Sequence, residues 1–279
     1  MLQRTITAVI FAAAMLGGVF GGKHTFFALF ALITAGSLWE LYGLLFATEK
    51  HLLLRRIAGS AFGLAPYLLI GGIALNITSH GALMLAGIAL IFFSAAVFML
   101  LELFLNPEKP FVYVGYYLLG MCYITLPFTL LTFLSQNEGV FFFTGGYEPW
   151  RVFGLLLLVW TNDSFAYILG SRLGKHKLFE RVSPKKTWEG FIGGGVMAML
   201  AAWGFAQVLD EYTTPQWLAL AFVAVVFGTL GDLVESMFKR SLGIKDSGNL
   251  LPGHGGLLDR FDAFMFAIPF YWLALTLTS

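Results

Sequence analysis

The sequence has little cysteine and little charge. Cys122 is its single cysteine, so an intrachain disulfide and a metal site made of several thiolates are both excluded. Charged residues make up 12% of the chain, whereas soluble proteins average about 25%. The net charge is +1, and no basic tail provides the long-range attraction that nucleic acid needs. We therefore expect no nucleic-acid partner, and we interpret Cys122 as a packing residue.

Apolar side chains take the place of the missing charge. Hydrophobic residues form 58% of the 279-residue chain, and the mean hydropathy is +0.79. A soluble domain of this length could not bury so many Phe, Leu and Ala side chains, whereas a lipid bilayer accommodates them and restricts the backbone to helices or closed barrels. The composition predicts an all-α, polytopic integral membrane protein whose first partner is the bilayer. The first segment lacks a convincing cleavage site for a signal peptide, so it is interpreted as a retained span.

Windows of about 20 apolar residues mark the candidate membrane spans. The sequence predicts nine, at roughly 5–22, 25–47, 57–78, 82–105, 112–134, 151–171, 190–209, 215–236 and 257–278. With this division every Lys and Arg except Lys23 and Arg151 falls on one side, which the positive-inside rule identifies as the cytoplasm. The expected location is the inner (cytoplasmic) membrane, with a cytoplasmic N-terminus and an active site that faces the cytoplasm.

Charge is unevenly distributed along the chain, which suggests two regions. Residues 1–150 hold spans one to five and few charged side chains. Residues 151–279 hold spans six to nine, most of the charge, and the polar loops 172–189 and 237–256. We therefore predict an N-terminal transmembrane region and a C-terminal catalytic region.

Ionisable residues inside the predicted spans are costly in a membrane and point to a functional site. Five acids lie within or at the ends of spans six, eight and nine: Asp163, Asp232, Glu235, Asp259 and Asp262. Residues three apart share one helix face, so the last four form two carboxylate pairs. Oxygen ligands without thiolates suit Mg²⁺. Alternatively, the acids pair with Arg260, Lys239 or Arg240 and only neutralise a helix end.

The two polar loops carry groups that suit phosphate. In the first, Pro184 fixes a turn before Lys185 and Lys186, and Thr187 with Glu189 is expected to cap the next helix. Both lysines would then lie near a helix N-terminus, where anions bind. The alternative is a basic loop that anchors on anionic lipid headgroups.

The second loop contains Gly253-His254-Gly255-Gly256, which suits a backbone nest that approaches a phosphate. Alternatively, these glycines only allow the chain to re-enter the membrane tightly. Glu40 and Glu102 lie far from both loops in the sequence and are interpreted as packing or interhelical hydrogen-bonding residues outside the site.

These residues resemble a known pattern, the signature of the phosphatidate cytidylyltransferases, also called CDP-diacylglycerol synthases. The matching positions are Ser236, Lys239, Arg240, Lys245, Asp246, Pro252, His254, Gly255, Gly256, Asp259, Arg260 and Asp262. SPKKTWEGFIGG at 183–194, the WTNDSFAY region and GDLVES at 231–236 are similar to the bacterial members, so the resemblance covers about residues 157–266. Ala263 stands where a Ser is expected. The resemblance implies that CTP and phosphatidic acid give CDP-diacylglycerol and pyrophosphate with Mg²⁺.

On this hypothesis each polar residue receives a role. The metal, one or two Mg²⁺ ions, is assigned to Asp232, Asp259 and Asp262, with Asp163 and Asp246 nearby as ligands or orienting groups. The phosphates are assigned to Lys239, Arg240, Lys245, Lys185 and Lys186. Ser236 and His254 would orient substrate, and Gly255 and Gly256 would approach it through their backbone. The expected catalytic set is Asp232, Asp246, Asp259, Asp262, Lys239 and Arg240.

Three alternatives stay open. A cytidylyltransferase for another phosphate lipid, such as an archaeal ether lipid, would need the same polar groups. An ion-coupled transporter would also contain buried carboxylates, but it would need polar groups reaching from both faces and a structural repeat. A structural scaffold would leave the acids and bases without a purpose. A homodimer is a further expectation, from the small-residue pairs Gly59/Gly63 and Gly190/Gly194, which allow helices to approach closely.

Overall fold

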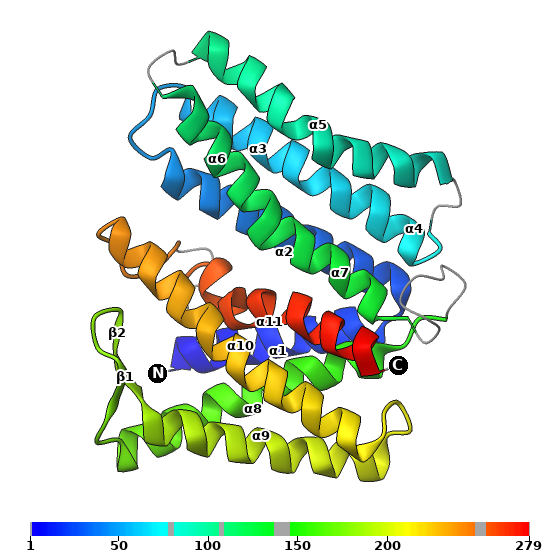
Figure 1. Cartoon of the computed structure of the whole chain (residues 1–279), viewed down its shortest axis with the longest axis vertical. Coiled ribbons are helices and arrows are strands. Elements are labelled where there is room, and N and C mark those ends of the chain that lie inside the picture. The colour runs from blue at the N-terminus through cyan, green and yellow to red at the C-terminus, as the bar shows by residue number, and fades with distance from the viewer. Residues whose placement is uncertain (1, 78–80, 106–108, 137–145, 249–254, 279) are drawn as a thin grey trace. The chain divides into compact units, whose positions relative to one another are not determined.

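The computed structural model describes the whole chain except residues 1, 78–80, 106–108, 137–145, 249–254 and 279 (Figure 1). Its chain divides into two compact units. Unit 1 consists of Met1–Tyr147 and Asp246–Arg260, and unit 2 consists of Glu148–Lys245 and Phe261–Ser279. The polar stretch found in the sequence is therefore shared between the units.

Unit 1 is made of helices (Figure 1). They are α1 (Leu2–Phe20), α2 (Lys23–Leu45), α3 (Leu52–Pro66), η1 (Tyr67–Gly71), α4 (Gly72–Ala74), α5 (Gly81–Leu105), α6 (Pro110–Gly120), η2 (Met121–Thr125) and α7 (Leu126–Leu134). The segments η1 and η2 are π-helical turns inside longer helices. Two candidate membrane spans therefore continue through these turns, over Leu52–Ala74 and Pro110–Leu134.

Unit 2 contains three whole helices, most of a fourth, and a hairpin. Its elements are α8 (Pro149–Leu173), β1 (Lys177–Phe179), β2 (Ser183–Thr187), α9 (Trp188–Val208), α10 (Thr214–Ser241) and α11 (Leu258–Thr278). Helix α11 begins with residues of unit 1 and continues in unit 2. The hairpin was not expected, because the loop 172–189 was interpreted without strands.

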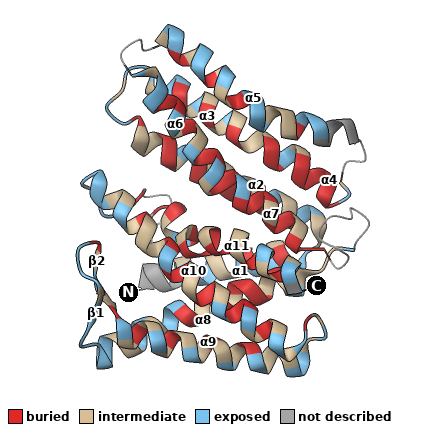
Figure 2. Ribbon diagram, in the orientation of Figure 1, coloured by how far each residue is buried: buried red, intermediate tan, exposed pale blue. Residues whose placement is uncertain are grey.

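The prediction of an all-α membrane protein is confirmed. Within the described residues, eight helical stretches are long and apolar enough to cross a membrane. The first predicted window corresponds to the shorter apolar helix Ile6–Phe20. Large apolar side chains are exposed on many helices, Phe92 at 78% and Phe104 at 83% among them, as expected where lipid replaces water as the solvent. Figure 2 shows buried positions along α2 and α7 and exposed ones along α5 and α9.

A buried ion pair links three helices of unit 1. Both nitrogens of one edge of Arg55 contact Glu102, at 2.9 and 2.7 Å, and both side chains are 0% exposed. The Tyr117 hydroxyl donates to Glu102 at 3.0 Å, and the Arg55 guanidinium lies 4.7 Å from the Tyr113 ring centre. Glu102 therefore joins helices α3, α5 and α6, which agrees with its interpretation as an interhelical hydrogen-bonding residue.

Removing Glu102 should strongly destabilise unit 1. Glu102→Ala leaves the Arg55 charge buried without its partner, which typically costs about 3–5 kcal/mol. Thermal unfolding in detergent should show a large loss, and replacing both residues by methionine should recover part of it. An exposed acid, Glu180, provides the control substitution Glu180→Gln. Equal unfolding temperatures for Glu102→Ala and Glu180→Gln would contradict the structural role.

Candidate active site

Glycines bring the helices of unit 2 close together around the predicted acids. A Cβ atom added to Gly190 of α9 would lie 2.6 Å from the Ala166 carbonyl oxygen of α8, and one added to Gly194 would lie 2.6 Å from that of Asn162. A Cβ added to Gly231 of α10 would lie 2.7 Å from the Asp262 carbonyl oxygen of α11. The absence of side chains at these positions permits the close approach expected of small residues, and it places Asp163, Asp232 and Asp262 on closely packed backbones.

The β-hairpin positions Lys186. Strands β1 and β2 pair Lys177 with Thr187 and Phe179 with Ser183. The Thr187 side chain caps α9 by accepting from the Gly190 N–H at 3.2 Å, as expected. Glu189 lies in the first turn of the same helix. Its carboxylate accepts from the His176 N–H at 3.2 Å and lies 2.7 Å from His176 Nδ1, which fixes the start of the hairpin to α9.

Lys186 and two acids form the first part of the site. Lys186 Nζ lies 2.7 Å from Asp232 Oδ2, and the two side chains are 25% and 32% exposed. The charges of Lys186 and Asp232 both act on Asp163, whose Oδ1 also lies 3.5 Å from Asn162 Nδ2. Three of the predicted site residues, from α8, β2 and α10, are therefore brought together.

Three carboxylates form the second part. The charges of Asp232 and Glu235 both act on Asp262. Glu235, which is 1% exposed, binds Lys239 Nζ at 2.6 Å, and the Ser236 hydroxyl donates to Asp232 at 3.2 Å. Negative charges this close repel one another, so the cluster favours a cation. Only oxygen donors are present, which fits a hard ion such as Mg²⁺. In the part of the chain that the structure describes, however, no three acids or histidines are arranged to hold a metal ion.

In unit 1 the site residues belong to the segment that leads into α11. Asp259 Oδ2 accepts from the Ser247 N–H at 2.9 Å and from the Gly256 N–H at 2.8 Å. Gly255 has φ +83°, and an added Cβ would lie 2.6 Å from Asp259 Oδ2. Asp259, predicted as a metal ligand, is thus a backbone acceptor in the described structure, and Gly255 is required by the turn.

Glu40 of α2 contacts this segment, although the sequence predicts it to lie outside the site. Its Oε2 accepts from the Leu258 N–H at 3.1 Å and from the Ser247 hydroxyl at 3.3 Å. The partners are 218 and 207 residues away in the sequence, so no local pattern reveals them. The sequence contains one indication of its role: Glu40 is an acid inside the predicted span 25–47, and an acid inside a span by default indicates function.

The remaining predicted residues are less closely connected. The Arg240 guanidinium donates to the Ile244 carbonyl at 2.9 Å and so closes the end of α10. Lys185, Lys245 and Asp246 are exposed. His254, with much of the predicted nest, lies outside the described residues. The assigned roles of all these residues stay predictions.

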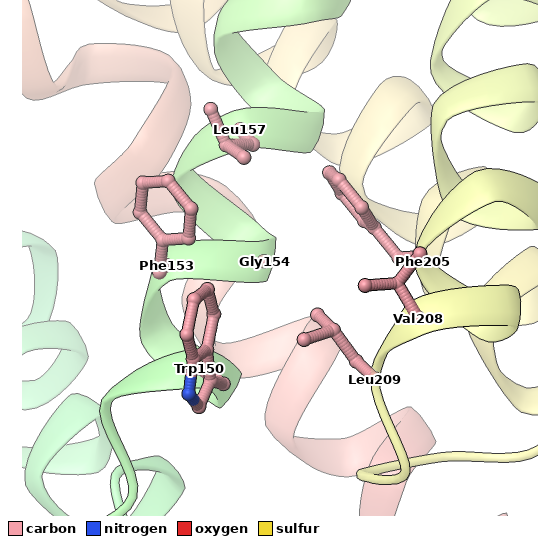
Figure 3. Close-up of a pocket in the computed structure, with 7 residues that line it drawn as sticks. All are labelled: Trp150, Phe153, Gly154, Leu157, Phe205, Val208 and Leu209. Atoms are coloured by element: carbon pink, nitrogen blue, oxygen red, sulfur yellow. The ribbon is translucent and has the colours of Figure 1, made fainter.

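An apolar pocket of about 320 Å³ lies between α8 and α9 (Figure 3). Trp150, Phe153, Gly154, Leu157, Phe205, Val208 and Leu209 line it. Asp163 is six residues beyond Leu157 on α8, roughly 9 Å along a helix. The pocket offers no charged side chain to a phosphate, so it is not the candidate active site.

The sequence is similar to known proteins along its whole length. It matches the profile described as the cytidylyltransferase family over residues 2–278. The phosphatidate cytidylyltransferase of Bacillus subtilis (strain 168) is 35% identical over 283 residues, which cover 100% of this chain and 99% of that protein. The phosphatidate cytidylyltransferase of Staphylococcus saprophyticus is 40% identical over 161 residues, 57% of this chain and 58% of that protein. The similarity thus extends beyond residues 157–266, where the motifs lie, into the first five spans.

Proposed function

Because the chain belongs to the cytidylyltransferase family, we propose that it transfers the cytidylyl group of CTP to phosphatidic acid, giving CDP-diacylglycerol and pyrophosphate. The observation that carries this proposal is the convergence of Lys186, Asp232 and Asp262 in unit 2. Bases for phosphate and acids for a cation are what a reaction between two polyanions requires. The similarity to a full-length phosphatidate cytidylyltransferase supports the choice of lipid.

The reaction forms one phosphorus–oxygen bond and breaks another. A phosphate oxygen of phosphatidic acid attacks the α-phosphorus of CTP, and the bond from that phosphorus to the bridging oxygen of the β-phosphate breaks. Pyrophosphate leaves with the bonding electron pair. The protein then has to align the two phosphates and stabilise the negative charge that moves to the leaving group. No covalent intermediate with the protein is needed.

The residues of unit 2 can divide these tasks. Lys186 and Lys239 each bind a carboxylate here, and both can turn to a phosphate when CTP enters. Asp232 and Asp262 would hold Mg²⁺, one ion or two, and Asp259 stays a further ligand predicted from the sequence. When bound, Mg²⁺ would neutralise phosphate oxygens on the attacked and leaving groups. The Ser236 hydroxyl, which donates to Asp232, would orient that carboxylate.

Membrane placement follows from the same proposal. Fifteen of the 17 Lys and Arg residues collect on one predicted side. We assign this side to the cytoplasm, where CTP is found, and the protein to the inner (cytoplasmic) membrane. The homodimer stays a prediction without new support. The glycines behind it pack within the chain, Gly59 against Tyr42 and Gly190 against Ala166.

Pyrophosphate release by the purified protein tests this function. Release should require CTP, Mg²⁺ and phosphatidic acid together, with omission of any one returning the rate to background. An ether-linked phosphate lipid in place of phosphatidic acid tests the rival lipid. Release that needs no lipid, or faster turnover of the ether lipid, would refute the assignment of the substrate.

Lys186→Ala should raise the KM for CTP about tenfold or more, since hydrogen bonds to charged groups are worth about 1.5–3 kcal/mol. The measurement is the initial rate against CTP concentration at saturating lipid. Lys177→Ala removes an exposed lysine of the same hairpin and serves as the control. An unchanged KM in Lys186→Ala would instead assign this lysine to the anchoring of the hairpin on lipid headgroups.

A further inference from the structure

Glu40 connects α2 to both ends of the segment 247–258 within unit 1. One of its carboxylate oxygens, Oε2, accepts from the Leu258 N–H at 3.1 Å and from the Ser247 hydroxyl at 3.3 Å. Leu258 is the first residue of α11, and its N–H has no acceptor inside that helix. A carboxylate at a helix N-terminus also interacts favourably with the helix dipole. Glu40 therefore stabilises the start of the helix that carries Asp259 and Asp262.

The glycines of this segment leave room for Glu40. A Cβ atom added to Gly248 would lie 2.8 Å from Glu40 Oε1, and one added to Gly256 would collide with Glu40 Oε2. One turn earlier on α2, Gly36 has no side chain where Leu257 packs against it. Residues four apart lie on the same helix face, so one face of α2 accommodates this segment through Gly36 and Glu40.

Asp259 also binds both ends of this segment. It accepts from the Ser247 and Gly256 N–H groups at 2.9 and 2.8 Å, while Glu40 binds the Ser247 hydroxyl and the Leu258 N–H. Two carboxylates from different helices thus hold four donors of one segment. Breaking either set would remove one of the two carboxylates that hold each end of this segment.

We propose that Glu40 is a positioning residue, which holds Ser247 and Leu258 so that the acids of α11 are correctly placed for cytidylyl transfer. Glu40 acts here as a hydrogen-bond acceptor of the right length, and its negative charge is secondary. The kinetic consequence rests on the proposed function, whereas the structural claim does not. The role differs from that of a metal ligand, which would depend on the charge itself.

Three substitutions separate length, charge and hydrogen bonding. Glu40→Gln keeps the length and one acceptor oxygen, Glu40→Asp keeps the charge but is one methylene too short, and Glu40→Ala removes both. Glu180→Gln removes an exposed acid from unit 2 and is the matched control. Each variant is purified in detergent as the full chain. Amide hydrogen exchange of peptides that cover residues 246–262 and the kinetics with CTP, Mg²⁺ and phosphatidic acid are then measured.

We expect Glu40→Ala and Glu40→Asp to raise the exchange rate in these peptides about tenfold, because a buried N–H without an acceptor costs about 1–3 kcal/mol. Their kcat should fall about 10–100-fold, since misplacement by about 1 Å can cost about 10²-fold. The KM for CTP should change less than kcat. Glu40→Gln and Glu180→Gln should remain within about threefold of wild type in both measurements, because both variants keep an acceptor oxygen at position 40.

Two results would overturn the inference. Wild-type exchange in Glu40→Ala would show that Glu40 does not hold the segment. Wild-type exchange in Glu40→Gln together with a kcat as low as that of Glu40→Ala would show that the charge acts directly in the reaction. If the wild-type protein itself shows no turnover, the proposed function fails, and the exchange data alone still decide whether Glu40 holds the segment.

Discussion

Asp262→Asn lowers turnover by about 10³-fold or more and leaves the protein folded in the membrane; this is the expected result if the acids of unit 2 form the active site. Asn has the same shape and keeps an oxygen that can accept from the Ala263 N–H, which is 2.7 Å from Asp262 Oδ1. It lacks the negative charge needed to hold a cation against the phosphates. Loss of a single group that stabilises transition-state charge commonly costs about 10²–10³-fold, and loss of a metal ligand costs at least as much.

The stability of Asp262→Asn should not fall together with its turnover. Asp262 lies beside Asp232 and Glu235, and the negative charges of both act on its carboxyl group. Neutralising one of three neighbouring carboxylates relieves repulsion, so the unfolding temperature should stay equal or rise. Initial rates of CDP-lipid formation and thermal unfolding of the same preparation provide the two readings. Asp210→Asn removes an exposed acid between α9 and α10 and serves as the control. A fully active Asp262→Asn enzyme would remove Asp262 from the site.

Removal of divalent cations is expected to reduce turnover to background, and added Mg²⁺ should restore it. The acid cluster of Asp232, Glu235 and Asp262 is compensated in the structure by Lys186 and Lys239, and the donors are those that Mg²⁺ prefers. Two polyanionic substrates would add further negative charge to this cluster, so without a cation their approach is strongly disfavoured.

Binding of Mn²⁺, measured by its electron paramagnetic resonance signal, tests the same claim without turnover. Wild-type protein with CTP should bind Mn²⁺, and Asp262→Asn should bind it at least about tenfold more weakly, about 1.4 kcal/mol. Asp210→Asn should bind like wild type. Full turnover in the presence of excess chelator, or equal Mn²⁺ affinity in wild type and Asp262→Asn, would contradict the assignment of Mg²⁺ to these acids.

The spans could be predicted from the sequence because each depends on local composition. Windows of apolar residues place the helices within a few residues of their observed bounds, and the cap at Thr187 follows from the residue type and its place before α9. Gly255 was expected in a glycine-rich phosphate nest or in a tight re-entry into the membrane, and its positive φ is a backbone conformation that favours glycine. Each of these features depends on the residues of one short segment, so it can be predicted from the sequence of that segment alone.

The remaining features depend on contacts between distant segments. The hairpin at 177–187 has no clear alternation of apolar and polar residues, since its strands are three and five residues long. The π-helical turns at Tyr67–Gly71 and Met121–Thr125 arise from packing that a hydropathy profile does not record. Glu40 reaches its partners across more than two hundred residues. The Lys186–Asp232 pair is a direct contact between two residues that were assigned to one site, but one to phosphate and the other to the metal.

The most direct test of the central claim follows the α-phosphorus of CTP. Wild-type protein in detergent micelles with phosphatidic acid and Mg²⁺ is given CTP labelled at the α-phosphate or, separately, at the γ-phosphate. The account predicts that the α-label moves into the lipid phase as CDP-diacylglycerol, while the γ-label stays in water as pyrophosphate, with equal initial rates. An α-label that stays in water as CMP, or a γ-label that enters the lipid, would show that the protein catalyses a different reaction.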